Sequence, residues 1–115
     1  MTAWMLRDEV AQRVAALEKS LTRLQAARLD AIVEIMADDG RFLLRDALDV
    51  GEFPAGDAPG QEAFQDFRKR VNQAAIDAHV ELRLELDSRK TTPDQRYCWF
   101  TGGDPHRRRH RVVKQ

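Results

Sequence analysis

Residues 80–87 read Val-Glu-Leu-Arg-Leu-Glu-Leu-Asp, with apolar and charged residues in strict alternation. Side chains of a β-strand point alternately to opposite faces, so this stretch predicts a strand with one apolar and one charged face, over about 80–89. Residues 91–95, Thr-Thr-Pro-Asp-Gln, have the composition of a turn. Residues 96–101, Arg-Tyr-Cys-Trp-Phe-Thr, predict a second strand rich in aromatic side chains. Together the two strands predict a C-terminal antiparallel β-hairpin.

The segment after the hairpin leaves two interpretations open. Gly-Gly-Asp-Pro at 102–105 is a turn signal. Residues 106–113 then either return as a short third strand or belong to a loose basic tail over 106–115. Within the second strand, Tyr97, Trp99 and Phe100 fall on both faces, so at least one of them is expected in the core.

Before the hairpin, the apolar residues recur with helical spacing. A helix is predicted over about 61–79, with its apolar stripe formed by Phe64, Phe67, Val71, Ala74, Ala75 and Ala78. Residues 51–60 contain three glycines and two prolines, which predicts a loop. Residues 41–50 are apolar enough to pack, but their pattern fits either a short helix or a strand.

The first third of the chain predicts a long amphipathic helix over about 5–38. Five apolar residues are spaced four, three, four and three apart, which is a heptad seam: Val10, Val14, Leu17, Leu21 and Leu24. No proline or glycine interrupts residues 1–39, and Gly40 is suited to end the helix. The alternative is a helix that breaks near Ser20 or Thr22 and folds back as an intramolecular hairpin.

These elements predict an α+β fold in a single domain over residues 1–115. The long helix and the second helix are expected to pack on one face of a small C-terminal antiparallel hairpin or three-stranded sheet. On that face the strand residues Leu82, Leu84 and Leu86 should meet the helix residues Phe64, Phe67 and Val71.

The length of the first helix favours self-association. Thirty-four helical residues span about 51 Å, whereas a compact domain of this size has a radius of gyration of about 13 Å. A second copy of the chain is the simplest cover for the exposed part of the seam, because twofold homodimers are the commonest assemblies. We therefore expect a homodimer held through Val10, Val14, Leu17, Leu21 and Leu24.

The charges are unevenly placed. The chain has 19 basic and 19 acidic residues, but residues 88–115 contain eight basic and only two acidic ones. Clustered arginines neutralise phosphates, and aromatic rings stack on unpaired bases. A surface for single-stranded nucleic acid or an acidic partner is therefore the alternative function, carried by Trp99, Arg107, Arg108, Arg109 and Arg111.

Other groups with reactive side chains offer weaker patterns. Cys98 with His106 and His110 supplies three zinc ligands, one fewer than a structural zinc site requires. A Cys98 nucleophile with His79 or His106, and an acidic group around Asp38 and Asp46, match no motif with known chemistry. We therefore predict no catalytic residues, no metal site and no cofactor. A third alternative, a small hydrolase or nuclease, would require a metal-dependent activity that is lost on changing Asp46 or Glu85.

The composition predicts the setting in which the protein acts. Hydrophobic residues make up 43% and charged residues 33% of the chain, and no stretch is long and apolar enough to span a membrane. The single cysteine fits a reducing compartment. The sequence thus predicts a non-enzymatic, self-associating protein–protein interaction or assembly module of a bacterial-type cytoplasmic system, with an unknown protein partner.

Overall fold

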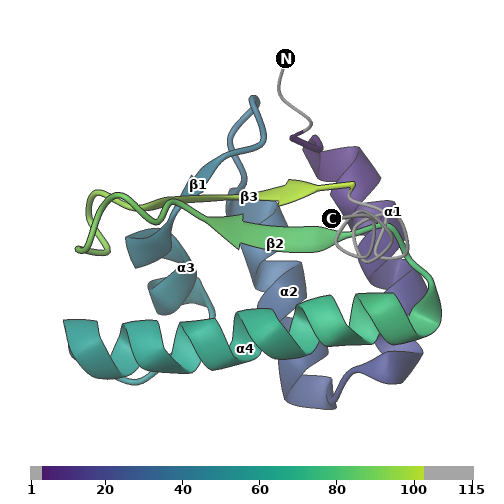
Figure 1. Ribbon diagram of the computed structural model, residues 1–115, viewed down its shortest axis with the longest axis horizontal. Helices are drawn as coiled ribbons and strands as arrows, with labels where there is room; N and C mark the ends of the chain where they lie inside the picture. The colour runs from purple at the N-terminus through teal and green to yellow at the C-terminus, as the bar shows by residue number, and fades with distance from the viewer. Residues whose placement is uncertain (1–3, 103–115) are drawn as a thin grey trace, which may run out of the picture.

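The computed structural model describes residues 4–102 and has an α+β fold, as predicted (Figure 1). Helices precede the sheet-forming hairpin in the chain. In order, the elements are α1 (Arg7–Leu17), the short 3₁₀-helix η1 (Glu18–Ser20), α2 (Arg23–Ile35), β1 (Phe42–Leu43), α3 (Leu44–Val50), α4 (Asp57–Ala78), β2 (Arg83–Leu86) and β3 (Tyr97–Thr101).

The sheet is antiparallel with the strand order β1-β3-β2. Leu84 of β2 lies opposite Phe100, and Phe42 of β1 lies opposite Cys98. The predicted hairpin is therefore present, although both strands are shorter than expected. The third strand is formed by residues 42–43 and leads directly into α3. The pattern of residues 41–50 fitted either a short helix or a strand, and the segment contains both. Residues 106–113 lie outside the described range.

The prediction of one long helix over residues 5–38 is wrong, because the chain turns between η1 and α2. Leu21 is extended, with φ −117° and ψ 152°. Thr22 then begins α2 with a capping box, in which its hydroxyl accepts from the Gln25 N–H and the Gln25 side chain accepts from the Thr22 N–H. The intramolecular hairpin with a break near Ser20 or Thr22 is the arrangement that the structure shows.

The α1–α2 hairpin divides the residues of the predicted seam between the core and the surface. Val10, Val14 and Leu17 are buried in the core of the chain itself. Leu21 is half-buried against that core, and Leu24 is 57% exposed on α2. Since buried side chains cannot contact a second copy unless the core opens, Val10, Val14 and Leu17 form an intramolecular contact rather than a dimer surface.

The loop predicted over 51–60 ends earlier than expected. Helix α4 starts at Asp57, and Pro59 occupies its first turn. Proline is tolerated there because the first N–H groups of a helix have no intrahelical partner. At the other end, His79 adopts a left-handed conformation with φ 58°, which stops the helix before the chain enters β2.

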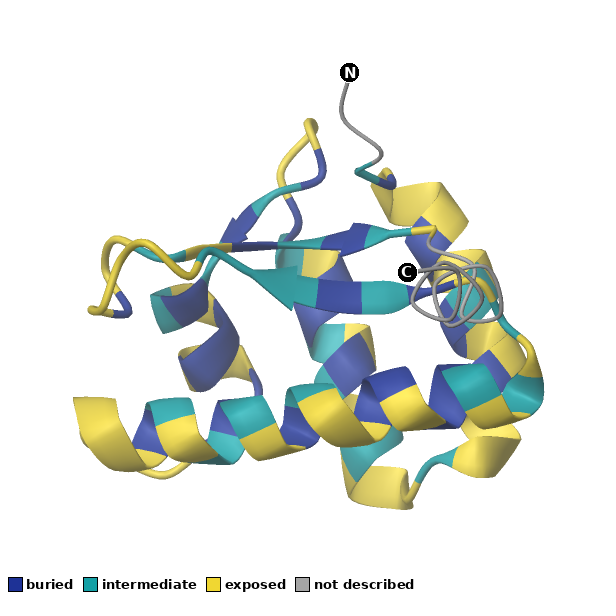
Figure 2. Ribbon diagram, in the orientation of Figure 1, coloured by how far each residue is buried: buried dark blue, intermediate teal, exposed yellow. Residues whose placement is uncertain are grey.

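The core lies between the sheet and the helices. Figure 2 shows buried and exposed residues alternating along α4, as expected for a helix with one packed side. Leu82, Leu84 and Phe100 of the hairpin are fully buried in the same cluster as Phe64, while Leu86 packs at its border. The predicted packing of the first strand against the second helix is therefore present.

The outer edge of β2 is closed by a side chain of α4. Asn72, only 7% exposed, accepts from the Leu84 N–H at 2.8 Å and donates to the Leu84 carbonyl at 3.1 Å. These two bonds replace those that a further strand would make at an edge. Asn72 thereby fixes β2, and with it the hairpin, against α4.

Candidate interaction surface

The outer face of the sheet carries the exposed aromatic side chains. Along β3, Cys98 and Phe100 are buried, so Tyr97, Trp99 and Thr101 point to the opposite side. Figure 1 shows α2, α3 and α4 on one side of the sheet and α1 at one end of it. We call the side without these three helices the aromatic face, formed by Trp4, Arg41, Leu43, Tyr97 and Trp99.

Trp4 joins this face through the backbone before α1. It pairs with Thr101 in an isolated antiparallel bridge, and the following Met5 N–H donates to the Phe100 carbonyl at 2.8 Å. The segment thus lies on the same edge of β3 as β1. Its indole stacks on Trp99, with the ring centroids 5.1 Å apart and the planes 28° from parallel.

Arg41 adds a cation to the aromatic rings. Its guanidinium carbon lies 4.6 Å from the Tyr97 centroid and 5.7 Å from the Trp4 centroid, within the range of a cation–π contact. Asp39 holds the arginine with an Nε–Oδ2 distance of 2.8 Å. The backbone N–H and guanidinium of Arg41 in turn lower the pKa of the Asp39 carboxyl.

A glycine lets the turn before β1 approach the N-terminal segment. Gly40 has φ +93°, and a Cβ atom there would lie 2.7 Å from the Met5 carbonyl oxygen. Any other residue would combine an unfavourable backbone conformation with this clash. The glycine therefore allows Arg41 and Trp4 to meet on the aromatic face.

The chemistry of the aromatic face is that of a binding surface. Tyr97 is 38% exposed, while Trp4 and Trp99 are half-buried. The face offers flat rings for stacking and a guanidinium for carboxylates or further rings. Beside Trp99, Glu85 is bound to Arg83 at 3.2 Å, so this acid is already engaged in an ion pair.

Only part of the site predicted for nucleic acid or an acidic partner lies within the described residues. Trp99 lies on the aromatic face, and Phe100 is the aromatic residue of its strand that enters the core, as expected for at least one of the three. Arg107, Arg108, Arg109 and Arg111 lie outside the described residues. The sequence predicted Tyr97 on the same strand as Trp99, and both lie on the aromatic face. Trp4 and Arg41 were not predicted as parts of this site.

Cys98 is buried in the core. Burial raises the pKa of its thiol to about 12, which disfavours the thiolate that acts as a nucleophile or metal ligand. Among residues 4–102, no group of three or more His, Cys, Asp and Glu side chains is placed to hold a metal ion. His79 lies at the end of α4, while His106 and His110 are outside the described range.

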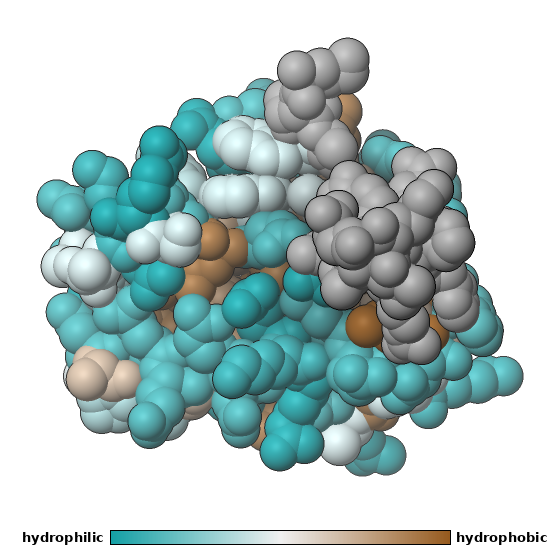
Figure 3. All heavy atoms as spheres, viewed as in Figure 1, coloured by the Kyte–Doolittle hydropathy of each residue, from teal (hydrophilic) through white to brown (hydrophobic). Residues whose placement is uncertain are grey.

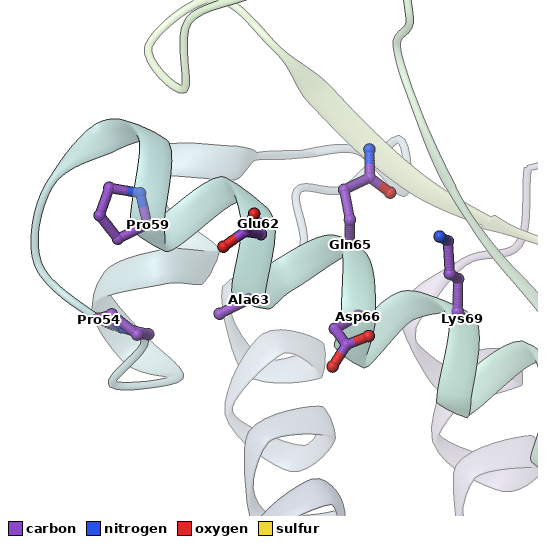
Figure 4. Close-up of a pocket in the computed structure, with 7 residues that line it drawn as sticks. All are labelled: Pro54, Pro59, Glu62, Ala63, Gln65, Asp66 and Lys69. Carbon is purple, nitrogen blue, oxygen red and sulfur yellow. The ribbon is translucent and has the colours of Figure 1, made fainter.

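The depressions on the surface have few converging polar groups. One of about 650 Å³ lies along α4 between Pro54 and Lys69. Figure 4 shows Gln65 and Lys69 extending to the opposite side of the helix from Asp66, so these groups do not converge on a shared ligand position. The view in Figure 3 is mostly hydrophilic, with small brown areas rather than one large apolar patch. No described helix is long and apolar enough to cross a membrane.

Comparisons with known proteins identify the family. Neither the curated proteins nor the solved structures include a match to this chain. A family model described as NACHT N-terminal Helical domain 6 matches residues 6–113. This description denotes a helical module of a NACHT NTPase. Because the match extends over nearly the whole length, the chain belongs to the NACHT N-terminal Helical domain 6 family.

Proposed function

We propose that this chain is a non-enzymatic, cytoplasmic interaction module that docks its aromatic face onto the NACHT NTPase with which its family is associated. The observation that carries the proposal is the Trp4–Trp99 stack, extended by Arg41 and Tyr97, on the side of the sheet away from α2, α3 and α4. Tryptophan, tyrosine and arginine are the residues most enriched among those that dominate binding energy at protein interfaces.

The seam of Val10, Val14 and Leu17 is not part of this proposal, because these side chains belong to the core. Self-association through the seam would require the α1–α2 hairpin to open and expose them. Docking through the aromatic face requires no such rearrangement, since its rings are already accessible at the surface. The proposed module therefore acts as a folded unit.

A photo-crosslinking amino acid at Tyr97 tests the proposed partner. In cells that contain a NACHT protein of the same system, we expect crosslinks from this position to peptides of the NACHT NTPase. The same amino acid at Glu62, which is exposed on α4, is the matched control and should give none. Adducts from Tyr97 that map only to unrelated proteins would contradict the proposal.

Removing one ring of the stack should weaken this docking. We expect Trp99→Ala to reduce the crosslinked fraction from Tyr97 by about tenfold to a hundredfold, the effect of losing an interface residue worth about 1.4–2.7 kcal/mol. Circular dichroism should show that the variant is folded, because Trp99 is only half-buried. Lys69→Ala, on the solvated side of α4, should leave the crosslink unchanged.

A second candidate, single-stranded nucleic acid, is favoured by the same stacked rings. Bases stack on aromatic side chains of open sheets, and nearby arginines bind phosphates. If this is the ligand, a mixed oligonucleotide should quench tryptophan emission. Its affinity should fall with salt, with a slope of about 0.7 for each phosphate contact. Changing Arg107, Arg108, Arg109 and Arg111 together to alanine should abolish the quenching, and unchanged emission of the original chain at low salt would exclude this candidate.

A further inference from the structure

Two turns next to the aromatic face hold an arginine in the same way. In the turn before β1, Asp39 accepts from the backbone N–H of Arg41 through Oδ1 at 3.0 Å and from its Nε through Oδ2 at 2.8 Å. In the turn after β2, the Oδ1 of Asp87 accepts from the backbone N–H of Arg89 at 2.9 Å and from its Nε at 3.3 Å. The backbone N–H of each arginine, together with its guanidinium, lowers the pKa of the aspartate that it contacts. Both aspartates are therefore ionised near neutral pH and anchor the arginines at Nε.

These two turns lie on opposite sides of Tyr97. The strand order β1-β3-β2 places Tyr97 on the middle strand. On the β1 side, the turn between α2 and β1 rises away from α4 (Figure 1), and the guanidinium of Arg41 lies 4.6 Å from the Tyr97 ring centroid. On the β2 side, the Asp87 N–H donates to the Tyr97 carbonyl at 2.9 Å, which brings the turn that holds Arg89 next to the same residue. Tyr97 thus has one anchored arginine on each side.

Both arginines keep one end of the guanidinium open to a ligand. The side chain of Arg41 is 40% exposed and that of Arg89 is 87% exposed. Within the described part of the chain, the hydrogen bonds of these two side chains run through Nε. Arg45 differs, because it contacts one carboxylate through Nε and a second through Nη2. The Nη1 and Nη2 groups of Arg41 and Arg89 therefore remain available for the two parallel bonds that a guanidinium makes to a carboxylate.

The charge balance of the face favours a few carboxylates over a polyanion. The arginines on and beside the face are each paired with one acid: Arg41 with Asp39, Arg83 with Glu85, and Arg89 with Asp87. These three pairs leave no excess of positive charge, whereas nucleic acid is bound by such an excess. Carboxylates that reach the open guanidinium ends need only short-range bonds. The rings between them suit an apolar side chain of the same ligand.

We propose that the aromatic face binds an acidic peptide segment. Two carboxylates of the segment bind Arg41 and Arg89, and an apolar side chain between these carboxylates packs on Tyr97 and the Trp4–Trp99 stack. The proposal rests on the proposed function in one respect, the use of the aromatic face for docking. It adds the chemistry of the docked segment, and it applies to any protein that carries such a segment.

Two short peptides test this chemistry without the partner. One is acetyl-Glu-Phe-Leu-Glu-amide, and the other has glutamine in place of both glutamates. Neither contains tryptophan, and the two tryptophans of the chain, Trp4 and Trp99, both belong to the stack. Tryptophan emission therefore reports binding at this face. We expect a saturable change of emission, with an affinity for the acidic peptide about tenfold above that for the neutral one, the effect of added charge-assisted bonds. Equal affinities, or no saturable change with either peptide, would overturn the proposal.

Arginine variants of the full chain assign the preference to the two turns. When Arg41 and Arg89 are changed together to glutamine, the acidic peptide should bind as weakly as the neutral one. The matched control changes Lys69 and Arg70, both exposed on α4, to glutamine and removes the same charge. This control should keep the preference for the acidic peptide. A preference that survives in the first variant, or is lost equally in the control, would contradict binding at Arg41 and Arg89. Circular dichroism checks that both variants are folded.

The outcome is separable from that of the proposed function. Crosslinks from Tyr97 to a NACHT NTPase, combined with equal affinities for the two peptides, would support docking and overturn the acidic segment. A preference that depends on Arg41 and Arg89, without such crosslinks, would support the acidic segment and contradict the NACHT NTPase as the partner. A mixed oligonucleotide that displaces the acidic peptide and binds more tightly through the same arginines would identify nucleic acid as the ligand and overturn the proposal.

Discussion

Phe64→Ala is expected to lower the free energy of unfolding by about 3–5 kcal/mol, the range for removing a buried phenylalanine. Phe64 is fully buried on α4. Its ring centroid lies 5.6 Å from that of Phe53 and 6.0 Å from that of Phe67. The substitution removes both contacts and leaves a cavity that rigid neighbours on the helices and sheet cannot fill.

This loss is large compared with the stability of an ordinary domain, about 5–15 kcal/mol. Urea denaturation should show a lower midpoint with an unchanged slope, which would assign the effect to stability rather than to an altered unfolded state. Glu62→Ala, on the exposed side of the same helix, should change stability by less than about 0.5 kcal/mol. A loss below about 1 kcal/mol for Phe64→Ala would contradict the packing described for this position.

Asn72→Ala is expected to cost about 2–3 kcal/mol, because it leaves the Leu84 N–H buried without a hydrogen-bond partner. The Leu84 carbonyl loses one of two donors and keeps Arg68, whose Nη1 lies 3.3 Å away. The substitution also reopens the edge of β2. Chemical denaturation measures the loss, and Gln73→Ala at the neighbouring exposed position is the control.

Asn72→Asp keeps the size of the side chain and replaces the amide that donates to the Leu84 carbonyl with a carboxyl group. An ionised carboxylate accepts from the Leu84 N–H but cannot donate to the Leu84 carbonyl, and it places a charge in a buried position. A protonated carboxyl can make both bonds. Relative to the unaltered protein, the variant should therefore be least stable at neutral pH and should regain stability as the pH falls toward 4. A difference in the free energy of unfolding between the variant and the unaltered protein that does not vary with pH would contradict this account. Asn72→Ala should show no recovery of stability at low pH.

The prediction of the hairpin and of the second helix succeeded because both depend on local pattern. Alternation over residues 80–87 is compatible with one buried face of a strand, and the spacing of Phe64, Phe67 and Val71 is compatible with one buried face of a helix. The boundaries were less accurate. At Pro59 a residue typical of loops also fits the first turn of α4, so composition alone placed that helix too late.

The wrong prediction of one continuous helix over residues 5–38 has a different cause. The spacing of Val10, Val14, Leu17, Leu21 and Leu24 is compatible with a continuous coiled coil and with two shorter helices, because both bury the same kind of stripe. The local signal that favoured the break was the Thr22–Gln25 capping box. Burial of the α1 residues in the core of the same chain then makes the compact hairpin consistent with the rest of the fold.

The sequence by itself determined the α+β class, the second helix, the hairpin and the position of Trp99 in a strand, since each follows from the periodicity of neighbouring residues. Only the tertiary structure decided that Phe42–Leu43 completes the sheet and that Trp4 and Arg41 join Tyr97 and Trp99 on one face. The physical reason is that a two-residue strand and a single bridge have no period of their own. They form because β3 offers unpaired backbone groups along one edge, and residues distant in the chain supply the partners.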